Sequence, residues 1–204
     1  MMKLFYAPGT VAAASLIALC ETGADFDPVR LNFAGKQQTK PEYLAINPKG
    51  RVPALVTTNG IITETAAVLT YIAETNPAAN LIPTDPFERA KMHEMISYLA
   101  ATVHVNHAHK LRGHRWADQQ SSHDDMTAKV AQNMLDCFGL IETALDKGPW
   151  IIGAQYTIAD AHLYIVESWL AGDGVPLEKL PNVAAHFDRM NKRPAVQRAL
   201  DIMG

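Results

Sequence analysis

The chain has 204 residues, of which 48% are hydrophobic and 19% are charged, and its formal net charge is −3. This length can bury a substantial core, and the slightly acidic balance gives no basic field that would favour binding to nucleic acid. The uncharged stretch from Leu4 to Cys20 contains Pro8 and Gly9 and follows no basic leader segment, so we expect no signal peptide, no membrane span and a cytoplasmic protein.

The first third of the chain predicts a small α/β domain. Asn59-Gly60 lies between two short runs of β-branched and leucine side chains, which is a strong hairpin signal. In chain order we expect a strand over 3–6, a helix over 11–20, a strand over 28–33, a weakly helical segment over 42–46, the two hairpin strands, and a helix over 66–74. The order β-α-β-α-β-β-α thus fills residues 1–77.

The remainder of the chain predicts helices only. Residues 78–85 form a connector rich in proline and asparagine, and helical patterns then continue to the C-terminus over 86–115, 124–147, 157–171, 181–192 and a short segment after Pro194. Thr157 and Asp160 have the spacing of a capping box at the start of one of these helices. The predicted fold class is therefore α/β plus all-α, with a domain over 1–77, a linker over 78–85 and an all-helical domain over 86–204.

The segment over 47–65 reads as a turn, a strand opened by Pro53, a hairpin and a helix start. On the residues alone, Pro53 fits an ordinary trans proline at the entry to a strand. Thr65 stands before a helical pattern and is a natural N-cap. A helix start offers free N–H groups that bind carboxylates, although a cap without a ligand fits the same sequence.

Three motifs together resemble one known family. They are Tyr6-Ala7-Pro8-Gly9 after the first strand, Arg51-Val52-Pro53-Ala54-Leu55, and Glu64-Thr65. The chain is similar to the glutathione transferase superfamily and nearest to its bacterial beta-type members. The resemblance implies a thioredoxin-like first domain that binds glutathione, a helical bundle domain that contributes the electrophile site, and a homodimer.

The resemblance also implies how glutathione would be held. The proline matching Pro53 is cis in the family, so the backbone N–H and C=O of Val52 would pair with the cysteinyl part of glutathione like an added strand. Glu64 would meet the γ-glutamyl ammonium and Thr65 its carboxylate. Lys36 aligns with a lysine that reaches the glycyl carboxylate, although an exposed loop lysine is otherwise a solvated charge.

The residue that activates the thiol is where the sequence departs from the beta-type pattern. These enzymes usually carry a cysteine two residues after the Pro-Gly turn, and this chain has Val11 there, followed by Ala12. A hydroxyl is the remaining choice. Thr10, at the entry to the first helix, is the first catalytic candidate and Tyr6 is the second. A helix cap is the alternative reading for Thr10, and a half-buried strand aromatic is the alternative for Tyr6.

Histidines gather in the first long helix of the second domain. His104 aligns with a histidine that lines the active site in beta-type enzymes, so the resemblance places it beside glutathione. Val11, His107, Arg112 and Trp116 are the candidates for binding the substrate, and a solvated helix face is the alternative for the histidines. At helical spacing, Ser97 and His104 share one stripe of this helix.

The sequence therefore predicts a transferase that adds the glutathione sulfur to a small electrophile. His104 and His107 have no cysteine or carboxylate close by in the sequence, so we expect no metal site. Cys20 and Cys137 lie in apolar helical runs and predict structural thiols. Two other functions stay open: a non-catalytic module of the same fold that binds a ligand or a protein, and a specialised glutathione-dependent isomerase or peroxidase.

Overall fold

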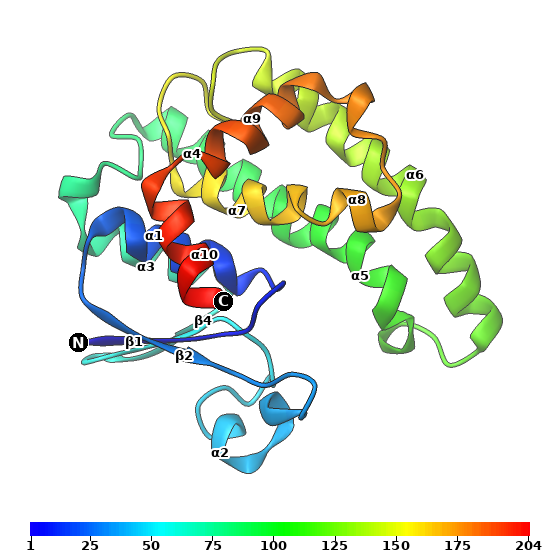
Figure 1. Ribbon diagram of the computed structural model, residues 1–204, viewed down its shortest axis with the longest axis horizontal. Helices are drawn as coiled ribbons and strands as arrows, with labels where there is room; N and C mark the ends of the chain where they lie inside the picture. Colours follow the sequence, from blue (N-terminus) through cyan, green and yellow to red (C-terminus); the bar gives the residue numbers. More distant parts are fainter. The chain divides into compact units, whose positions relative to one another are not determined.

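The computed structural model describes all residues from 1 to 204 and divides the chain into two compact units (Figure 1). The first unit contains Met1–Thr84 together with Met190–Gly204, and the second contains Asp85–Arg189. The first is an α/β unit built on one sheet, and the second contains helices and no strand longer than an isolated bridge. The predicted combination of an α/β domain and an all-helical domain is correct.

The sheet of the first unit has four strands in the order β2-β1-β3-β4. They are β1 (Met2–Tyr6), β2 (Phe26–Arg30), β3 (Ala54–Thr57) and β4 (Gly60–Thr63). β1 runs parallel to β2 and antiparallel to β3, and β3 and β4 form the predicted hairpin. The second strand begins and ends earlier than the predicted range of 28–33.

Three helices of the first unit pack together, namely α1 (Ala12–Thr22), α3 (Thr65–Thr75) and α10 (Pro194–Met203). Figure 1 shows them on one side of the sheet, with α2 (Pro41–Leu44) on the other. The first nine residues of α1 are all buried, which explains why this helix is so rich in alanine and leucine. Short 3-10 turns lie at Gln37–Thr39 (η1) and Pro77–Ala79 (η2).

The C-terminal helix belongs to the first unit, whereas the sequence assigned it to a helical domain over 86–204. Its apolar face packs against α1, and polar contacts fix its ends. Arg193 makes a two-pronged ion pair with Glu21 at 2.6 and 3.0 Å. The hydroxyl of Tyr6 donates to the carbonyl of Ile202 at 3.0 Å, and Arg30 donates to that of Met203 at 3.0 Å. The local sequence pattern does not predict these long-range contacts.

The second unit is built from helices of very different length. They are α4 (Pro86–Tyr98), α5 (His104–Arg112), α6 (Gln120–Leu145), α7 (Ile158–Glu167), α8 (Leu170–Asp173) and α9 (Pro181–Asn191), with α9 ending just beyond the unit, and with 3-10 turns η4 (Gly113–Arg115) and η5 (Leu177–Lys179). All ten residues of α7 are buried, so this helix forms the centre of the unit. None of the helices has both the length and the apolar character needed to cross a membrane.

A π-helical turn, η3 (Leu99–Val103), interrupts the predicted helix over 86–115 between α4 and α5. A π turn inserts an extra residue and rotates everything that follows around the helix axis. The expectation that Ser97 and His104 share one stripe is therefore wrong, because it assumed unbroken α-helical spacing.

The predicted capping box at α7 is confirmed and lies at the edge of a buried charge cluster. The Thr157 hydroxyl accepts from the N–H of Ala159, and the Asp160 carboxylate accepts from the N–H groups of Thr157 and Ile151, both at 2.8 Å. His186 joins Asp160 at 3.2 Å to Glu167 at 2.8 Å. Burial lowers the pKa of His186, but the two carboxylates outweigh it and raise the pKa to about 9.

Candidate functional site

One end of the sheet brings together the segments singled out in the first unit. Phe5 lies opposite Ala54 on β3, and Ala54 lies opposite Thr63 on β4. One residue further along, the chain therefore places Tyr6, Pro53 and Glu64 at the same edge. The starts of α1 and α3 follow directly from β1 and β4, so two helix N-termini point toward this edge as well.

Val52 presents an unpaired stretch of backbone at this edge. The peptide bond between Val52 and Pro53 is cis, as the resemblance implied. Val52 precedes β3, and its N–H and C=O make no hydrogen bond within the chain. The preceding carbonyl, of Arg51, accepts from the Tyr43 hydroxyl and the Asn47 side chain at 2.6 Å each, which fixes the loop. Free backbone donors and acceptors in an extended segment suit a peptide ligand that adds as a strand.

The start of α3 differs from the prediction by one residue. Thr65 is the first residue inside the helix, and Glu64 occupies the N-cap position with φ of 74°, so the prediction that Thr65 is the N-cap is wrong. The reason is that the turn after β4 places the left-handed residue at Glu64 and lets the helix begin directly after it. No side chain caps this terminus, which leaves its first N–H groups available to an anion.

Glu64 has a partner that the sequence did not reveal. Lys49 donates to its carboxylate at 2.5 Å and to the hydroxyl of Thr63 at 2.7 Å. Both charged side chains are about half exposed or more, so Glu64 can readily exchange Lys49 for another cationic partner. A backbone held at positive φ in a non-glycine residue costs free energy and is typical of ligand sites. The sequence predicted only a turn for the segment that contains Lys49.

The two candidate hydroxyls, of Tyr6 at the end of β1 and of Thr10 shortly before α1, are in different states. The Thr10 hydroxyl is partly exposed and donates to the carbonyl of Ala7 at 2.7 Å. α1 begins at Ala12, with Val11 at the N-cap position and no side-chain cap. Tyr6 is only 2% exposed, and its proton is directed to Ile202. Thr10 therefore has the accessible hydroxyl of the two, close to the start of α1, where the N–H groups of Ala13 and Ala14 donate to the carbonyls of Thr10 and Val11.

Lys36 lies away from these contacts on an exposed loop. It has φ of 53°, precedes η1, and its side chain has no partner within the chain. Its ammonium is therefore available to an anionic group, and nothing in the first unit fixes where it points.

The second unit carries the remaining candidates. His104 and His107 lie on α5, with ring centroids 6.5 Å apart, and both rings contact Trp169. His107 Nδ1 lies 2.7 Å from a carboxylate oxygen of Asp173. Trp169 and Asp173 were missed from the sequence, because they are distant along the chain and belong to no motif.

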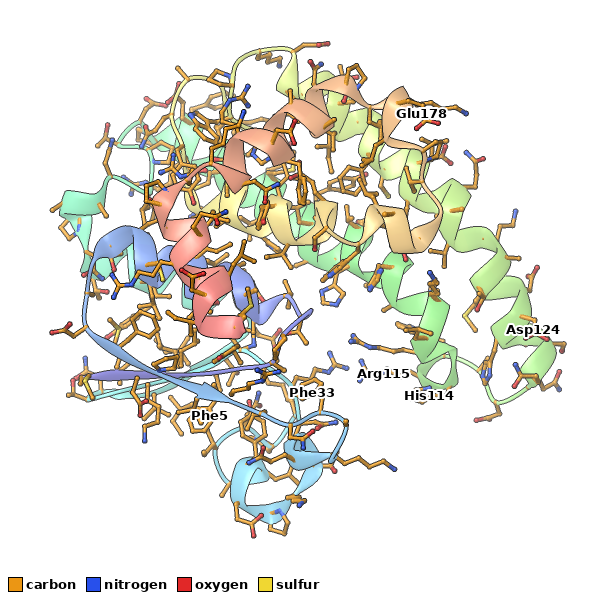
Figure 2. The ribbon with its side chains drawn as sticks, viewed as in Figure 1. Phe5, Phe33, His114, Arg115, Asp124 and Glu178 are labelled. Atoms are coloured by element: carbon orange, nitrogen blue, oxygen red, sulfur yellow. The ribbon has the colours of Figure 1, made fainter.

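The end of α5 is rich in cationic and aromatic side chains. Arg112 is the last residue of the helix, and Trp116 is 48% exposed and meets the ring of His109 edge-on at 4.6 Å. Figure 2 shows His114 and Arg115 projecting from the turn that follows α5. Nowhere in the chain are three or more His, Cys, Asp or Glu side chains grouped so as to hold a metal ion.

The chain thus combines an α/β unit, in which the backbone of Val52 is unpaired at the sheet edge, with an all-helical second unit. The family described as glutathione S-transferase, N-terminal domain, matches residues 1–74, and its C-terminal domain matches residues 106–201. The chain belongs to the glutathione S-transferase family, and its first domain is thioredoxin-like.

Known proteins resemble the chain along its whole length. Glutathione S-transferase GstA of Escherichia coli O157:H7 is 34% identical over all of this chain and 99% of its own. A crystal structure of a Sulfitobacter glutathione transferase homolog with bound glutathione is 46% identical, has a TM-score of 0.96, and is matched over 99% of this chain and 98% of that one. Maleylacetoacetate isomerase of Pseudomonas aeruginosa is 28% identical over 97% of this chain and 95% of its own.

Proposed function

We propose that the protein is a glutathione transferase that conjugates the thiolate of glutathione to small electrophilic substrates. The observation that carries the proposal is the sheet edge at Val52, where an unpaired N–H and C=O lie next to the uncapped start of α3. A tripeptide with a carboxylate at one end fits this combination of a strand edge and an anion site. Glutathione is the co-substrate, and the reaction uses no metal.

The first unit supplies one group for each part of glutathione. Val52 pairs with the cysteinyl backbone, and the start of α3 with Thr65 receives the γ-glutamyl carboxylate. Glu64 accepts from the ammonium, exchanging its pair with Lys49 for one with the ligand. Lys36 reaches the glycyl carboxylate. Each assignment matches a charge on the ligand with the opposite charge or a free donor on the protein.

Thr10 stabilises the thiolate in this proposal. The beta-type cysteine has no counterpart here, since Val11 stands in its place, and Cys20 and Cys137 are both buried. The hydroxyl proton of Thr10 is directed to Ala7, so donation to sulfur requires the hydroxyl to rotate. The positive end of the α1 helix dipole stabilises the same negative charge.

Glutathione affinity should fall when the ammonium loses its carboxylate partner. Glu64→Gln removes the charge and keeps the shape, and we expect the dissociation constant to rise about tenfold, since a hydrogen bond to a charged group contributes about 1.5–3 kcal/mol and glutamine retains part of it. Calorimetric titration with glutathione measures this. Glu74→Gln, near the other end of the same helix, is the matched control and should bind as the wild type does. Equal affinity of the Glu64 variant would remove Glu64 from the site.

Two alternatives are separated by simple measurements. A non-catalytic ligand-binding or interaction module would bind glutathione without lowering its thiol pKa, or would not bind it at all. A specialised isomerase or peroxidase would ionise the thiol yet prefer a substrate that does not stay bonded to sulfur. The similarity to a maleylacetoacetate isomerase favours including unsaturated acids in the substrate screen.

We also propose that the protein is a cytoplasmic homodimer. Phe87 and Leu140 are 74% and 66% exposed, and both line a pocket of about 530 Å³ between α4 and α6. Apolar side chains exposed next to a hollow are typical of a surface that another protein covers. Sedimentation equilibrium should give twice the chain mass of 22.3 kDa, and a mass of one chain at micromolar concentration would refute the dimer.

A further inference from the structure

The sheet of the first unit has one face that is covered only in part. α1, α3 and α10, of ten or eleven residues each, lie on the other face, whereas the α-helix on this side is α2, of four residues (Figure 1). Side chains alternate between the two faces of a strand, so Phe5 points away from the face on which Tyr6 contacts α10. Figure 2 shows Phe5 on the α2 side, where its ring meets that of Tyr43 with centroids 5.6 Å apart. Phe5 is only half-buried, so this face keeps apolar surface open.

A pocket of about 450 Å³ lies where this face meets the segment 31–46. Its apolar lining consists of Phe5, Val29, Leu31, Tyr43 and Ile46. Leu31 and Tyr43 are buried and form the floor, whereas Val29 and Ile46 are half-buried, as Phe5 is. A pocket of this size with a mainly apolar lining and a few polar groups is typical of a small-molecule site.

Two amide side chains that line the pocket have N–H groups without a partner in the chain. Asn32 Oδ1 accepts from the N–H of Gly35, and Gln37 Oε1 accepts from the N–H of Asn32, both at 2.9 Å. Because a backbone donor holds each oxygen, the amide nitrogen is the atom left for a ligand. These two groups therefore offer hydrogen-bond donors to an acceptor such as a carboxylate.

The pocket also carries one cation and one carboxylate that are not paired with each other. Lys40 and Glu42 both line it and are both exposed, and neither takes part in an ion pair of the chain. They are two residues apart, so one small ligand can meet both. Opposite charges beside an apolar floor complement a ligand that has both charges on one carbon atom and an apolar side chain.

We propose that this pocket binds a free α-amino acid with an aromatic side chain. The aromatic ring packs against Phe5 and Tyr43, since aromatic rings pair in tilted or offset arrangements. The carboxylate meets Lys40 and the free amide groups, and the ammonium meets Glu42. The proposal is independent of the transferase function, because the pocket lies wholly within the first unit and its lining does not include Val52, Glu64 or Thr65.

Titration of the isotope-labelled full-length protein with L-tryptophan, followed by amide chemical shifts in NMR spectra, tests the site. Saturating S-methylglutathione is present throughout, because it occupies the glutathione site. We expect the largest shifts within residues 29–46. N-acetyl-L-tryptophan has no ammonium and L-tryptophanamide has no carboxylate. Each should have a dissociation constant about twofold to fivefold higher than that of L-tryptophan, since exposed ion pairs are weak.

Two substitutions separate the contributions of the two charges. Lys40→Gln should weaken binding of L-tryptophan and N-acetyl-L-tryptophan about twofold to fivefold and leave that of L-tryptophanamide unchanged. Glu42→Gln should weaken L-tryptophan and L-tryptophanamide by a similar factor and leave N-acetyl-L-tryptophan unchanged. Lys192→Gln is the matched control, because it removes an exposed lysine of the same unit, between α9 and α10, that does not line the pocket. It should bind all three ligands as the wild type does.

Several outcomes would overturn the proposal. They are no binding at millimolar L-tryptophan, equal affinity for the three ligands, and unchanged affinity in both pocket variants. Displacement of L-tryptophan by S-methylglutathione, or shifts centred on Val52 and Glu64, would assign the amino acid to the glutathione site and would overturn it too. A protein that binds L-tryptophan in the pocket but does not bind S-methylglutathione would support this site and contradict the transferase function instead.

Discussion

Replacing Asp160 with alanine is expected to lower the free energy of unfolding by about 3–5 kcal/mol, the usual cost of removing one partner from a buried charge pair. Its carboxylate accepts from the N–H groups of Thr157 and Ile151 at 2.8 Å each and lies 3.2 Å from His186. All of these groups are buried, so water cannot replace the lost oxygen atoms. The start of α7 would lose its cap at the same time.

Urea unfolding followed by circular dichroism measures the change, with Asp125→Ala as the matched control. Asp125 is an exposed aspartate on α6, where the same substitution should change stability little. If Asp160→Ala unfolded at the same urea concentration as the control, the capping box and the charge cluster would not stabilise the fold.

The same cluster predicts how stability depends on pH. The pKa of His186 is raised in the folded state to about 9, above the value of about 6.5 expected when unfolded. Its contribution is therefore fully present below about pH 6.5 and is lost as the pH rises through 9. Alkaline unfolding of the wild type should therefore begin at a lower pH than that of His186→Phe, when each protein is compared with its own stability at neutral pH. The variant has no imidazole proton to lose in this range.

Thr10→Val should raise the thiol pKa of bound glutathione by about one unit, at 1.36 kcal/mol per unit. A hydrogen bond to a charged sulfur contributes about 1.5–3 kcal/mol, from which the lost bond to Ala7, about 0.5–1.5 kcal/mol, must be subtracted. Valine keeps the shape and removes the hydroxyl. Turnover at saturating glutathione and neutral pH should fall by up to about tenfold, and recover partly at high pH, where the thiol ionises unaided.

Tyr6→Phe decides between the two hydroxyls. If Tyr6→Phe raised the thiol pKa and Thr10→Val did not, Thr10 would be the wrong assignment. If neither variant slowed turnover, no side-chain hydroxyl would activate the thiol. Since the Tyr6 hydroxyl donates to Ile202, its removal should also loosen the last turn of α10, which hydrogen exchange of that helix reports.

Local chemistry made much of the fold predictable. The Asn59-Gly60 hairpin, the first strand and helix, and the capping box at Thr157 all depend on residues within a few positions of one another, so the sequence pattern contains them. The cis bond before Pro53 came from the family resemblance rather than from the residues, which alone fit an ordinary trans proline.

What could not be predicted depends on contacts between distant segments. α10 packs beside α1, at the other end of the chain, and His107 meets Asp173 across 66 residues. The π turn before His104 and the left-handed backbone of Glu64 are set by packing rather than by propensity. For the same reason the sequence offered candidate site residues only where a motif pointed to them, and it did not predict the contacts of Lys49, Trp169 and Asp173.

Ultraviolet titration of glutathione bound to the protein tests the central claim most directly. Thiolate absorbance is followed across pH at saturating protein, and calorimetry establishes that the ligand is bound. The account predicts binding together with a thiol pKa about one to two units below the value of about 8.5 for an ordinary thiol. Binding with an unshifted pKa, or no binding at all, would contradict it.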